Sequence, residues 1–189
     1  MAVDYFVDFE LLPDPEFAPH LLLAALYAKL HRALVACDSS DIAVSFPDHQ
    51  TNPPSLGARM RLLGSQQALQ VLTATDWLSG MHDHVKASGL VRVPTDAAHR
   101  VLRRVQAKSS PERLRRRLIK RHGLDETQAR ERIPDSATET LHLPFVQLRS
   151  SSTGQTFRLF LSLGAEQPAP VSGQFNTHGL SQTATVPWF

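Results

Sequence analysis

The chain has 189 residues, of which 42% are hydrophobic and 20% are charged, a composition typical of one or two small globular domains. Its longest apolar run, residues 21–28, is shorter than the roughly 18 residues that a membrane-spanning helix needs. A secretory signal begins with basic residues, but no Lys or Arg precedes Lys29, and the single cysteine, Cys37, cannot form an internal disulfide. These features argue against a membrane or disulfide-stabilised secreted protein and predict a cytoplasmic one without a membrane partner.

The net charge of +2 is unevenly distributed along the chain. Residues 100–121 contain ten basic residues and one acid, Glu112, so this segment carries +9 and the other 167 residues together carry −7. A basic segment in an otherwise acidic chain indicates a surface that binds a polyanion. A charged helix that only meets solvent is the alternative.

The first half of the chain has the element order β-α-β-β-α-β, which predicts a ferredoxin-like (RRM-like) domain over residues 1–95. Leu- and Ala-rich residues 17–36 predict one helix, and Ser65 is placed to cap a second that runs to about residue 73. Strand patterns occur at residues 5–11, 42–46, 60–63, 81–85 and 90–93. Unrelated proteins share this fold, so it does not predict a function.

The second half, residues 96–189, is predicted to be an α+β domain with an arginine-rich helix. An extended segment at 101–107 precedes the basic helix, which Ser110 and Pro111 open and Gly123 ends. Asp125 and Gln128 have the spacing of a capping box for a second, short helix. Paired strands are predicted at residues 145–149 and 157–163, while residues 167–189 show no clear pattern.

The basic helix segregates its charges. At about 100° per residue, one face carries five cations: Arg113, Arg116, Arg117, Lys120 and Arg121. Leu114, Leu118 and Ile119 fall on the opposite face, where they can pack on the protein. The five cations repel each other, and a nucleic acid would relieve that repulsion. Both RNA and DNA fit these residues.

Arg104 and Gln106 lie just before this helix, two residues apart on a predicted strand, and therefore share a face. Arg suits a bidentate contact with guanine and Gln one with adenine, which makes the pair a candidate for base reading. Ordinary surface residues are the alternative.

Histidines and serines supply the candidate catalytic groups. RNA carries its own nucleophile, the 2′-hydroxyl, so a nuclease that uses it needs a base and phosphate donors and no metal or other cofactor. His31 shares a helix face with Tyr27 and is either that base or an ordinary core or surface histidine. The closest approach to a metal motif, His82 and His84, lacks further ligands, and we expect strand residues there.

A serine-rich loop follows the predicted strand at 145–149. Ser150, Ser151 and Ser152 precede Thr153 and Gly154, a pattern of either an ordinary hairpin turn or a group of hydroxyls and N–H groups around a phosphate. A serine hydroxyl is a poor base unaided, so the proton would pass to His31. Phe157, further along, either stacks on a base or fills the core.

Taken together, these residues resemble the repeat-processing endoribonuclease of subtype I-F CRISPR systems. Each matching segment is weak alone, while their order and spacing are specific. The segments are Pro13-Asp14-Pro15-Glu16-Phe17, Lys29-Leu30-His31, Val44-Ser45-Phe46-Pro47-Asp48, Arg104-Val105-Gln106-Ala107-Lys108-Ser109, Pro111-Glu112-Arg113-Leu114-Arg115-Arg116-Arg117-Leu118, Leu148-Arg149-Ser150, Ser152-Thr153-Gly154-Gln155, Phe157-Arg158-Leu159-Phe160 and Val186-Pro187-Trp188-Phe189.

The resemblance implies that the substrate is the repeat hairpin of precursor CRISPR RNA, cut on the 3′ side of its stem. In the family, the 2′-hydroxyl attacks the adjacent phosphate and leaves a 2′,3′-cyclic phosphate and a 5′-hydroxyl. By resemblance, the enzyme keeps the mature CRISPR RNA and stays with the other subunits of the interference complex.

The resemblance also assigns roles to residues. His31 matches the base, Ser150 the residue that positions the ribose, and Ser152 and Thr153 a loop near the cut. The RNA-binding residues implied are Arg104 and Gln106, which read bases, Phe157, which stacks beneath the stem, and Arg116, Arg117, Lys120 and Arg121, which line the groove. Lys108 and Arg113, in the same basic segment, are further RNA-binding candidates. His178 stands where the family has Tyr. We expect His178 to pack on His31, and a general acid is the alternative.

Two other functions fit part of the pattern. A binding-only protein would hold the RNA hairpin without cutting it. A DNA-binding regulator would place the arginine-rich helix in a major groove.

Overall fold

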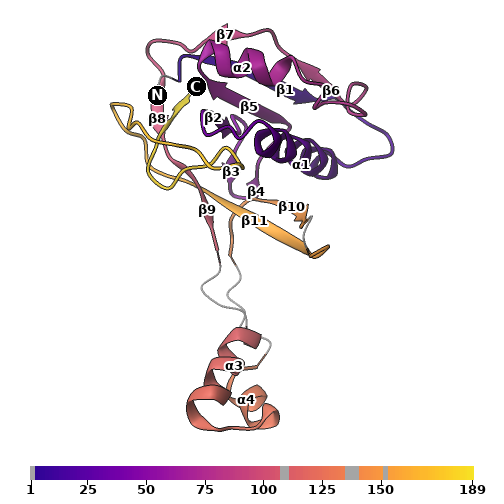
Figure 1. Ribbon diagram of the computed structural model, residues 1–189, viewed down its shortest axis with the longest axis vertical. Coiled ribbons are helices and arrows are strands. Elements are labelled where there is room, and N and C mark those ends of the chain that lie inside the picture. The colour runs from indigo at the N-terminus through magenta and orange to yellow at the C-terminus, as the bar shows by residue number, and fades with distance from the viewer. Residues whose placement is uncertain (1–2, 107–110, 135–140, 151–152) are drawn as a thin grey trace. The chain divides into compact units, whose positions relative to one another are not determined.

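The computed structural model describes residues 3–106, 111–134, 141–150 and 153–189, and it mixes helices and strands as an α+β protein (Figure 1). The chain forms two compact units, one from residues 1–105 with 143–189 and the other from residues 106–142. Within the described residues, no helix has both the length and the apolar character that a membrane crossing requires.

An antiparallel sheet with β1 (Tyr5–Leu11) near its centre is the framework of the first unit. Strands neighbour each other in the order β2-β5-β1-β6, and β7 also pairs with β1. The bounds of the other strands are β2 Ile42–Ser45, β5 Arg59–Gly64, β6 Val85–Ala87 and β7 Val91–Arg92. β1 alternates as the sequence predicts, because Val7, Phe9 and Leu11 are buried while the residues between them are not.

Helices α1 (Pro19–Ala36) and α2 (Gln66–Thr73) pack on this sheet. Ser65 accepts the backbone N–H of Ala68 and so caps α2, as its position in the sequence predicts. Helix α1 buries residues at helical spacing, namely Leu22, Leu23, Leu26, Tyr27, Leu30 and Leu34. This apolar stripe belongs to one core that includes the main sheet and buried residues of strands later in the chain, such as Val146 and Leu159.

Two details of the first half differ from the sequence prediction. Residues 81–84 form a turn rather than a strand, closed by the N–H of His84 on the carbonyl of Met81, and β6 begins only at Val85. A small hairpin of β3 (Gln50–Thr51) and β4 (Pro54–Ser55) had no sequence signal, because strands of two residues have no periodicity to detect.

A second, three-stranded sheet lies in the same unit, in the order β10-β11-β9. Its strands are β9 Leu102–Val105, β10 Phe145–Arg149 and β11 Thr156–Leu163, and the predicted pairing of the last two is confirmed. β10 packs against α1 (Figure 1). β12 (Val186–Trp188), in the tail that the sequence left unassigned, pairs with β8 (Ala98–Arg100).

Arg61 of β5 is a buried charge, with 4% of its surface exposed. It makes a two-pronged ion pair with Asp8, at 2.6 and 2.8 Å, and donates to the carbonyl of Phe189 at 3.0 Å. Its guanidinium lies over the rings of Phe6 and Phe189, 4.4 and 3.9 Å from their centroids. These contacts attach the last residues of the chain to the main sheet.

The second unit contains α3 (Pro111–His122) and α4 (Glu126–Arg132). Gly123 follows α3 with a positive φ of 63°, and the capping box of Asp125 and Gln128 is present, so both sequence predictions are confirmed. Pro111 and Ala129 are its only buried residues among those described. This unit therefore has almost no core of its own.

Candidate functional site

His31 projects from α1 and binds the chain near its far end. Its Nδ1 lies 2.7 Å from the carbonyl oxygen of Thr177, 146 residues away in sequence. A carbonyl can only accept, so Nδ1 must carry the hydrogen. In the neutral ring this leaves the lone pair on Nε2, which can then take up a proton.

Tyr27, one helical turn before His31, holds the neighbouring carbonyl. Its hydroxyl donates to the carbonyl oxygen of His178 at 2.7 Å. Complete burial raises the pKa of Tyr27, so the phenol stays protonated and continues to donate. Two side chains of α1 thus hold consecutive carbonyls of one turn.

That turn, residues 176–180, is also closed from within. The Asn176 side-chain oxygen accepts the N–H groups of His178 and Leu180, at 2.8 and 3.2 Å. The carbonyl of Gly179 accepts the N–H of Val44 at 2.9 Å, which ties the turn to β2. Gly179 has a φ of +68°, and a Cβ there would lie 2.5 Å from Cγ2 of Val44, so only glycine fits.

The ring of His178 stacks on the ring of His31. Their centroids are 3.9 Å apart and the planes differ by 8°, while the ring of Tyr27 is parallel to His178 at 6.0 Å. Burial, followed by the charges of His31 and Arg104, lowers the pKa of His178 to about 4. At neutral pH, His178 is therefore an uncharged ring packed against the candidate base.

Arg104 and Phe157 approach the same site from the second sheet. The guanidinium of Arg104 lies 5.8 Å from the centroid of the Phe157 ring, and its charge acts on both Tyr27 and His178. Arg104 and Phe157 are on neighbouring strands, on the sheet face that also carries the buried Leu102, Leu159 and Leu161. The structure therefore gathers His31, His178 and Arg104 within one unit.

Ser150 follows the last residue of β10, and β10 packs against the helix that carries His31. Its backbone binds Gln155 and Gly154, and its hydroxyl accepts the N–H of Thr153 at 3.2 Å. These bonds are those of a hairpin turn. Ser152 lies outside the described residues.

The cations predicted to bind RNA from α3 are all exposed: Arg113, Arg116, Arg117, Lys120 and Arg121. On the other side of the helix, Leu114, Leu118 and Ile119 are half-buried, and α3 packs on α4. Gln106 is exposed and belongs to this second unit. Lys108 lies outside the described residues.

Tyr27, Asn176, Thr177 and Gly179 were not singled out from the sequence. Asn176 and Gly179 are residue types typical of turns, so the sequence contained a signal for this turn. It contained no signal that the turn would contact α1. His82 and His84 lie on the turn at 81–84, where His84 binds Asp14 at 2.8 Å. Among the described residues, no three His, Cys, Asp or Glu side chains are grouped to hold a metal ion.

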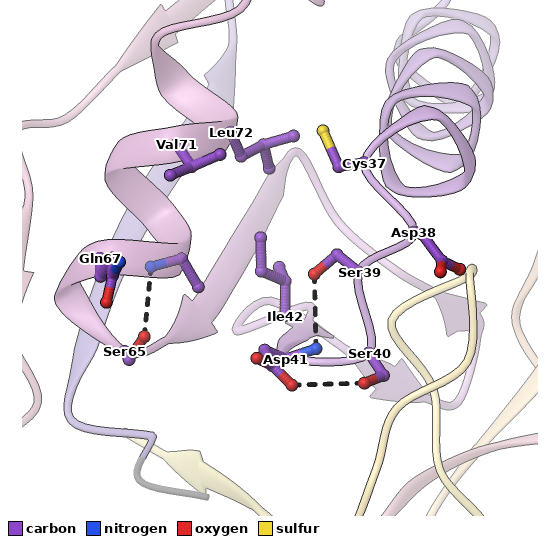
Figure 2. Close-up of a pocket in the computed structure, with 11 residues that line it drawn as sticks. Cys37, Asp38, Ser39, Ser40, Asp41, Ile42, Ser65, Gln67, Val71 and Leu72 are labelled. Carbon is purple, nitrogen blue, oxygen red and sulfur yellow. Dashed lines mark hydrogen bonds between the residues drawn. The ribbon is translucent and has the colours of Figure 1, made fainter.

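A polar pocket lies apart from this site, between the end of α1 and the start of α2 (Figure 2). Its side chains bind their own neighbours: Ser39 accepts the N–H of Asp41, Ser40 donates to the Asp41 carboxylate, and Ser65 caps α2. The polar groups of this pocket thus support local structure.

Comparisons with known proteins agree with the resemblance seen in the sequence. A family model described as CRISPR-associated protein (Cas_Csy4) matches residues 6–189. A relative named CRISPR-associated endonuclease Cas6/Csy4, from Pseudomonas aeruginosa (strain UCBPP-PA14), is 49% identical over 187 residues, which are 99% of this chain and 100% of the relative. A protein of the same name from Escherichia coli (strain UTI89 / UPEC) is 47% identical with the same coverage. The chain therefore belongs to the Cas_Csy4 family of CRISPR-associated proteins.

Proposed function

We propose that this protein is an endoribonuclease of a subtype I-F CRISPR system, which binds the repeat hairpin of precursor CRISPR RNA and cuts it on the 3′ side of the stem. The observation that carries this proposal is the fixed tautomer of His31, whose Nε2 is left to accept a proton. Its context is a chain that matches named CRISPR-associated endonucleases over its whole length.

The proposed reaction is a transesterification within the RNA. His31 Nε2 takes the proton of the 2′-hydroxyl, O2′ forms a bond to the adjacent phosphorus, and the bond from phosphorus to O5′ breaks. The leaving O5′ takes up a proton, so the products are a 2′,3′-cyclic phosphate and a 5′-hydroxyl. Because the substrate supplies the nucleophile, we propose that no metal ion or other cofactor takes part.

We assign supporting roles to four further residues. Ser150 positions the ribose that carries the nucleophile, and Ser152, outside the described residues, belongs to the same loop. His178 holds the His31 ring by stacking, a role that its low pKa supports because a ring uncharged at neutral pH has no acidic proton to give. Phe157 stacks beneath the stem.

The RNA-binding surface that we propose has two parts. Arg104 and Gln106 read bases at the bottom of the stem. The exposed cations of α3, with Lys108 just before it, contact phosphates along the stem; they are Arg113, Arg116, Arg117, Lys120 and Arg121. Glu112 is the only acid within α3, and this excess of positive charge supports a polyanion rather than a protein partner.

We further propose two domains along the sequence, a ferredoxin-like one over residues 1–95 and an RNA-binding one with an arginine-rich helix over residues 96–189. The antiparallel order β2-β5-β1-β6, with α1 after β1 and α2 after β5, supports the first. All strands of the five-stranded sheet fall within residues 5–92, while β8 to β12 pair among themselves.

By the same reasoning, the protein acts in the cytoplasm, keeps the mature CRISPR RNA and joins other subunits of the interference complex. A second candidate function is a subunit that binds the hairpin without cutting it. Every RNA-binding residue would serve that function equally well, and only the arrangement around His31 favours cleavage.

The test is cleavage of the cognate repeat hairpin in EDTA with enzyme in excess. Wild type is compared with His31→Ala and with a substrate that has 2′-deoxyribose before the cut. His20→Ala, which removes an exposed histidine from the same helix, is the matched control. We expect wild type and His20→Ala to cut, and His31→Ala to lose about 10²- to 10⁴-fold in rate, as is usual for a general base.

The deoxy substrate should bind but remain intact. Cleavage of that substrate, or complete inhibition of wild type by EDTA, would contradict the mechanism. Tight binding without cleavage by wild type would establish the binding-only function instead.

A further inference from the structure

The three-stranded sheet β10-β11-β9 has one face that takes no part in the core. Strand register places Phe145 beside Phe160, Gln147 beside Arg158, and Ser162 beside Arg103 on this face. The opposite face packs into the main core through Val146, Leu148, Leu159 and Leu161. We call the set Arg103, Phe145, Gln147, Arg149, Arg158 and Phe160 the outer sheet face.

Aromatic and cationic side chains alternate on the outer sheet face. The Phe145 ring is 41% exposed and lies 5.4 Å from the Phe160 ring, and the Arg158 guanidinium sits 4.7 Å over Phe145. Arg103, Arg149 and Arg158 are all exposed. The three strands contain no Asp or Glu, so these charges have no acidic neighbour within the sheet.

This combination is not needed for stability. An exposed phenylalanine such as Phe145 gains little from folding, and three arginines on one small sheet repel each other. Of the three, Arg149 uses its Nε to bind the carbonyl of Gly154 and keeps its other donors on the surface. The arrangement is favourable only if something planar and anionic lies on it.

We propose that the outer sheet face binds an unpaired RNA segment continuous with the hairpin. Aromatic rings and guanidinium planes on a sheet are surfaces on which splayed bases stack, and flanking arginines neutralise the phosphates between them. The inference rests on the proposed function, because it assigns a second contact to the same RNA. It concerns unpaired nucleotides, whereas the contacts proposed above concern the stem and the cut.

An acidic protein partner is the competing occupant of such a face. An interface core is typically apolar and depleted of charge, whereas this face combines three exposed arginines with two aromatic rings. Bases supply the stacking partner that an acidic peptide lacks. The observations therefore favour RNA.

The experiment measures how much a single-stranded flank improves hairpin binding. Three RNAs with 2′-deoxyribose before the cut are titrated: the bare hairpin, and the hairpin with about ten unpaired nucleotides on its 5′ side or its 3′ side. The test protein is Phe145→Ala/Arg158→Ala. The matched control, Phe17→Ala/Arg92→Ala, removes an exposed phenylalanine and an arginine that lies over a tyrosine ring elsewhere in the same unit.

We expect wild type and the control to bind at least one flanked RNA about fivefold or more tightly than the bare hairpin. The test protein should lose this advantage and still bind the bare hairpin normally, and it should cut an all-ribose bare hairpin at the wild-type rate. The pair Arg158→Gln and Arg158→Lys then separates charge from stacking, since Lys keeps the charge without the planar group.

Equal flank advantages in the test protein and wild type, or none in wild type, would overturn the inference and favour a protein partner. Failure of wild type to bind the bare hairpin would instead overturn the proposed function. Thermal unfolding of both double variants shows whether a lost binding advantage arises from misfolding. If the test protein is misfolded, the binding advantage of the single variant Arg158→Gln is used to test the inference instead.

Discussion

The turn at residues 176–180 and the helix α3 hold two groups of candidate functional residues in opposite surroundings. The turn is bonded to α1 and β2, stacks a ring on His31 and admits no side chain at Gly179. Helix α3 buries only Pro111 and exposes its cations to solvent. At the turn, the fold therefore holds functional groups in fixed positions, whereas on α3 it presents exposed positive charge.

The difference follows from what each task requires. Proton transfer needs a base held within hydrogen-bond reach of one hydroxyl, so small displacements matter. Attraction of a phosphate backbone depends on charge that can reach it, and long side chains adjust. Substitutions that disturb the turn at residues 176–180 or its support should accordingly affect stability and cleavage, whereas those on α3 should affect binding alone.

The largest loss of stability is expected when the buried ion pair of Asp8 and Arg61 is broken. Asp8→Ala leaves Arg61 buried without its carboxylate and should lower the free energy of unfolding by about 3 kcal/mol. Adding Arg61→Met should restore most of that loss, because an apolar side chain suits the space between the rings of Phe6 and Phe189. Urea unfolding measures both variants. Glu10→Ala, exposed on the same strand, is the control, and an equal loss there would contradict the role of the pair.

A smaller loss of unfolding free energy is expected when a substitution displaces the turn at residues 176–180 from β2. Gly179→Ala combines a positive φ with a contact to Val44 and should cost about 2 kcal/mol in unfolding free energy. Cleavage should fall as well, because the displaced turn carries the carbonyl that holds His31. Gly80→Ala is the control, with a φ of +73° and no atom within 4 Å of its Cβ. Equal effects of the two substitutions would mean that backbone strain alone matters.

On α3 the expectation is a loss of affinity without a loss of stability. Arg117→Ala should weaken hairpin binding by about fivefold and reduce the slope of log affinity against log salt by about one. Its free energy of unfolding should stay the same or rise, since one of five repelling charges is gone. Arg130→Ala, exposed on α4, is the control. A marked drop in stability for Arg117→Ala would remove the contrast between the two regions.

The last effect concerns the protonation of His178 and appears only when the pH falls below about 6.5. The pKa of His178 is about 4 in the folded protein, below the ordinary 6.5. Between these pH values the unfolded chain therefore binds a proton at His178 that the folded chain does not bind. The stability that this group contributes is present above pH 6.5, falls as the pH drops from about 6.5 to about 4, and changes no further below that. His178→Phe should remove this part of the pH dependence, measured by urea unfolding at several pH values.

The same variant tests the role of His178 in cleavage. A ring that only stacks can be replaced by Phe with the pH–rate profile unchanged in shape and a modest loss of rate. Loss of one limb of that profile would show instead that His178 transfers a proton.

Patterns within short stretches of sequence were sufficient for most elements. The alternation at 5–11, the leucine spacing of α1 and the capping box at Asp125 each arise from neighbours along the chain, and the structure has them. The strand predicted at 81–85 was wrong because its turn depends on hydrogen bonds that composition does not signal. The tail had no pattern because β12 exists only by pairing with β8.

The candidate site divides in the same way. By itself the sequence determined the basic helix, the presence of a histidine on α1 and the family, since each depends on residue types in order. Only the tertiary structure decided which nitrogen of His31 carries the hydrogen, that Tyr27 and Asn176 fix the turn, and that His178 stacks there uncharged. The physical reason is that hydrogen bonding, stacking and burial act between atoms that fold together from opposite ends of the chain, and no local periodicity encodes them.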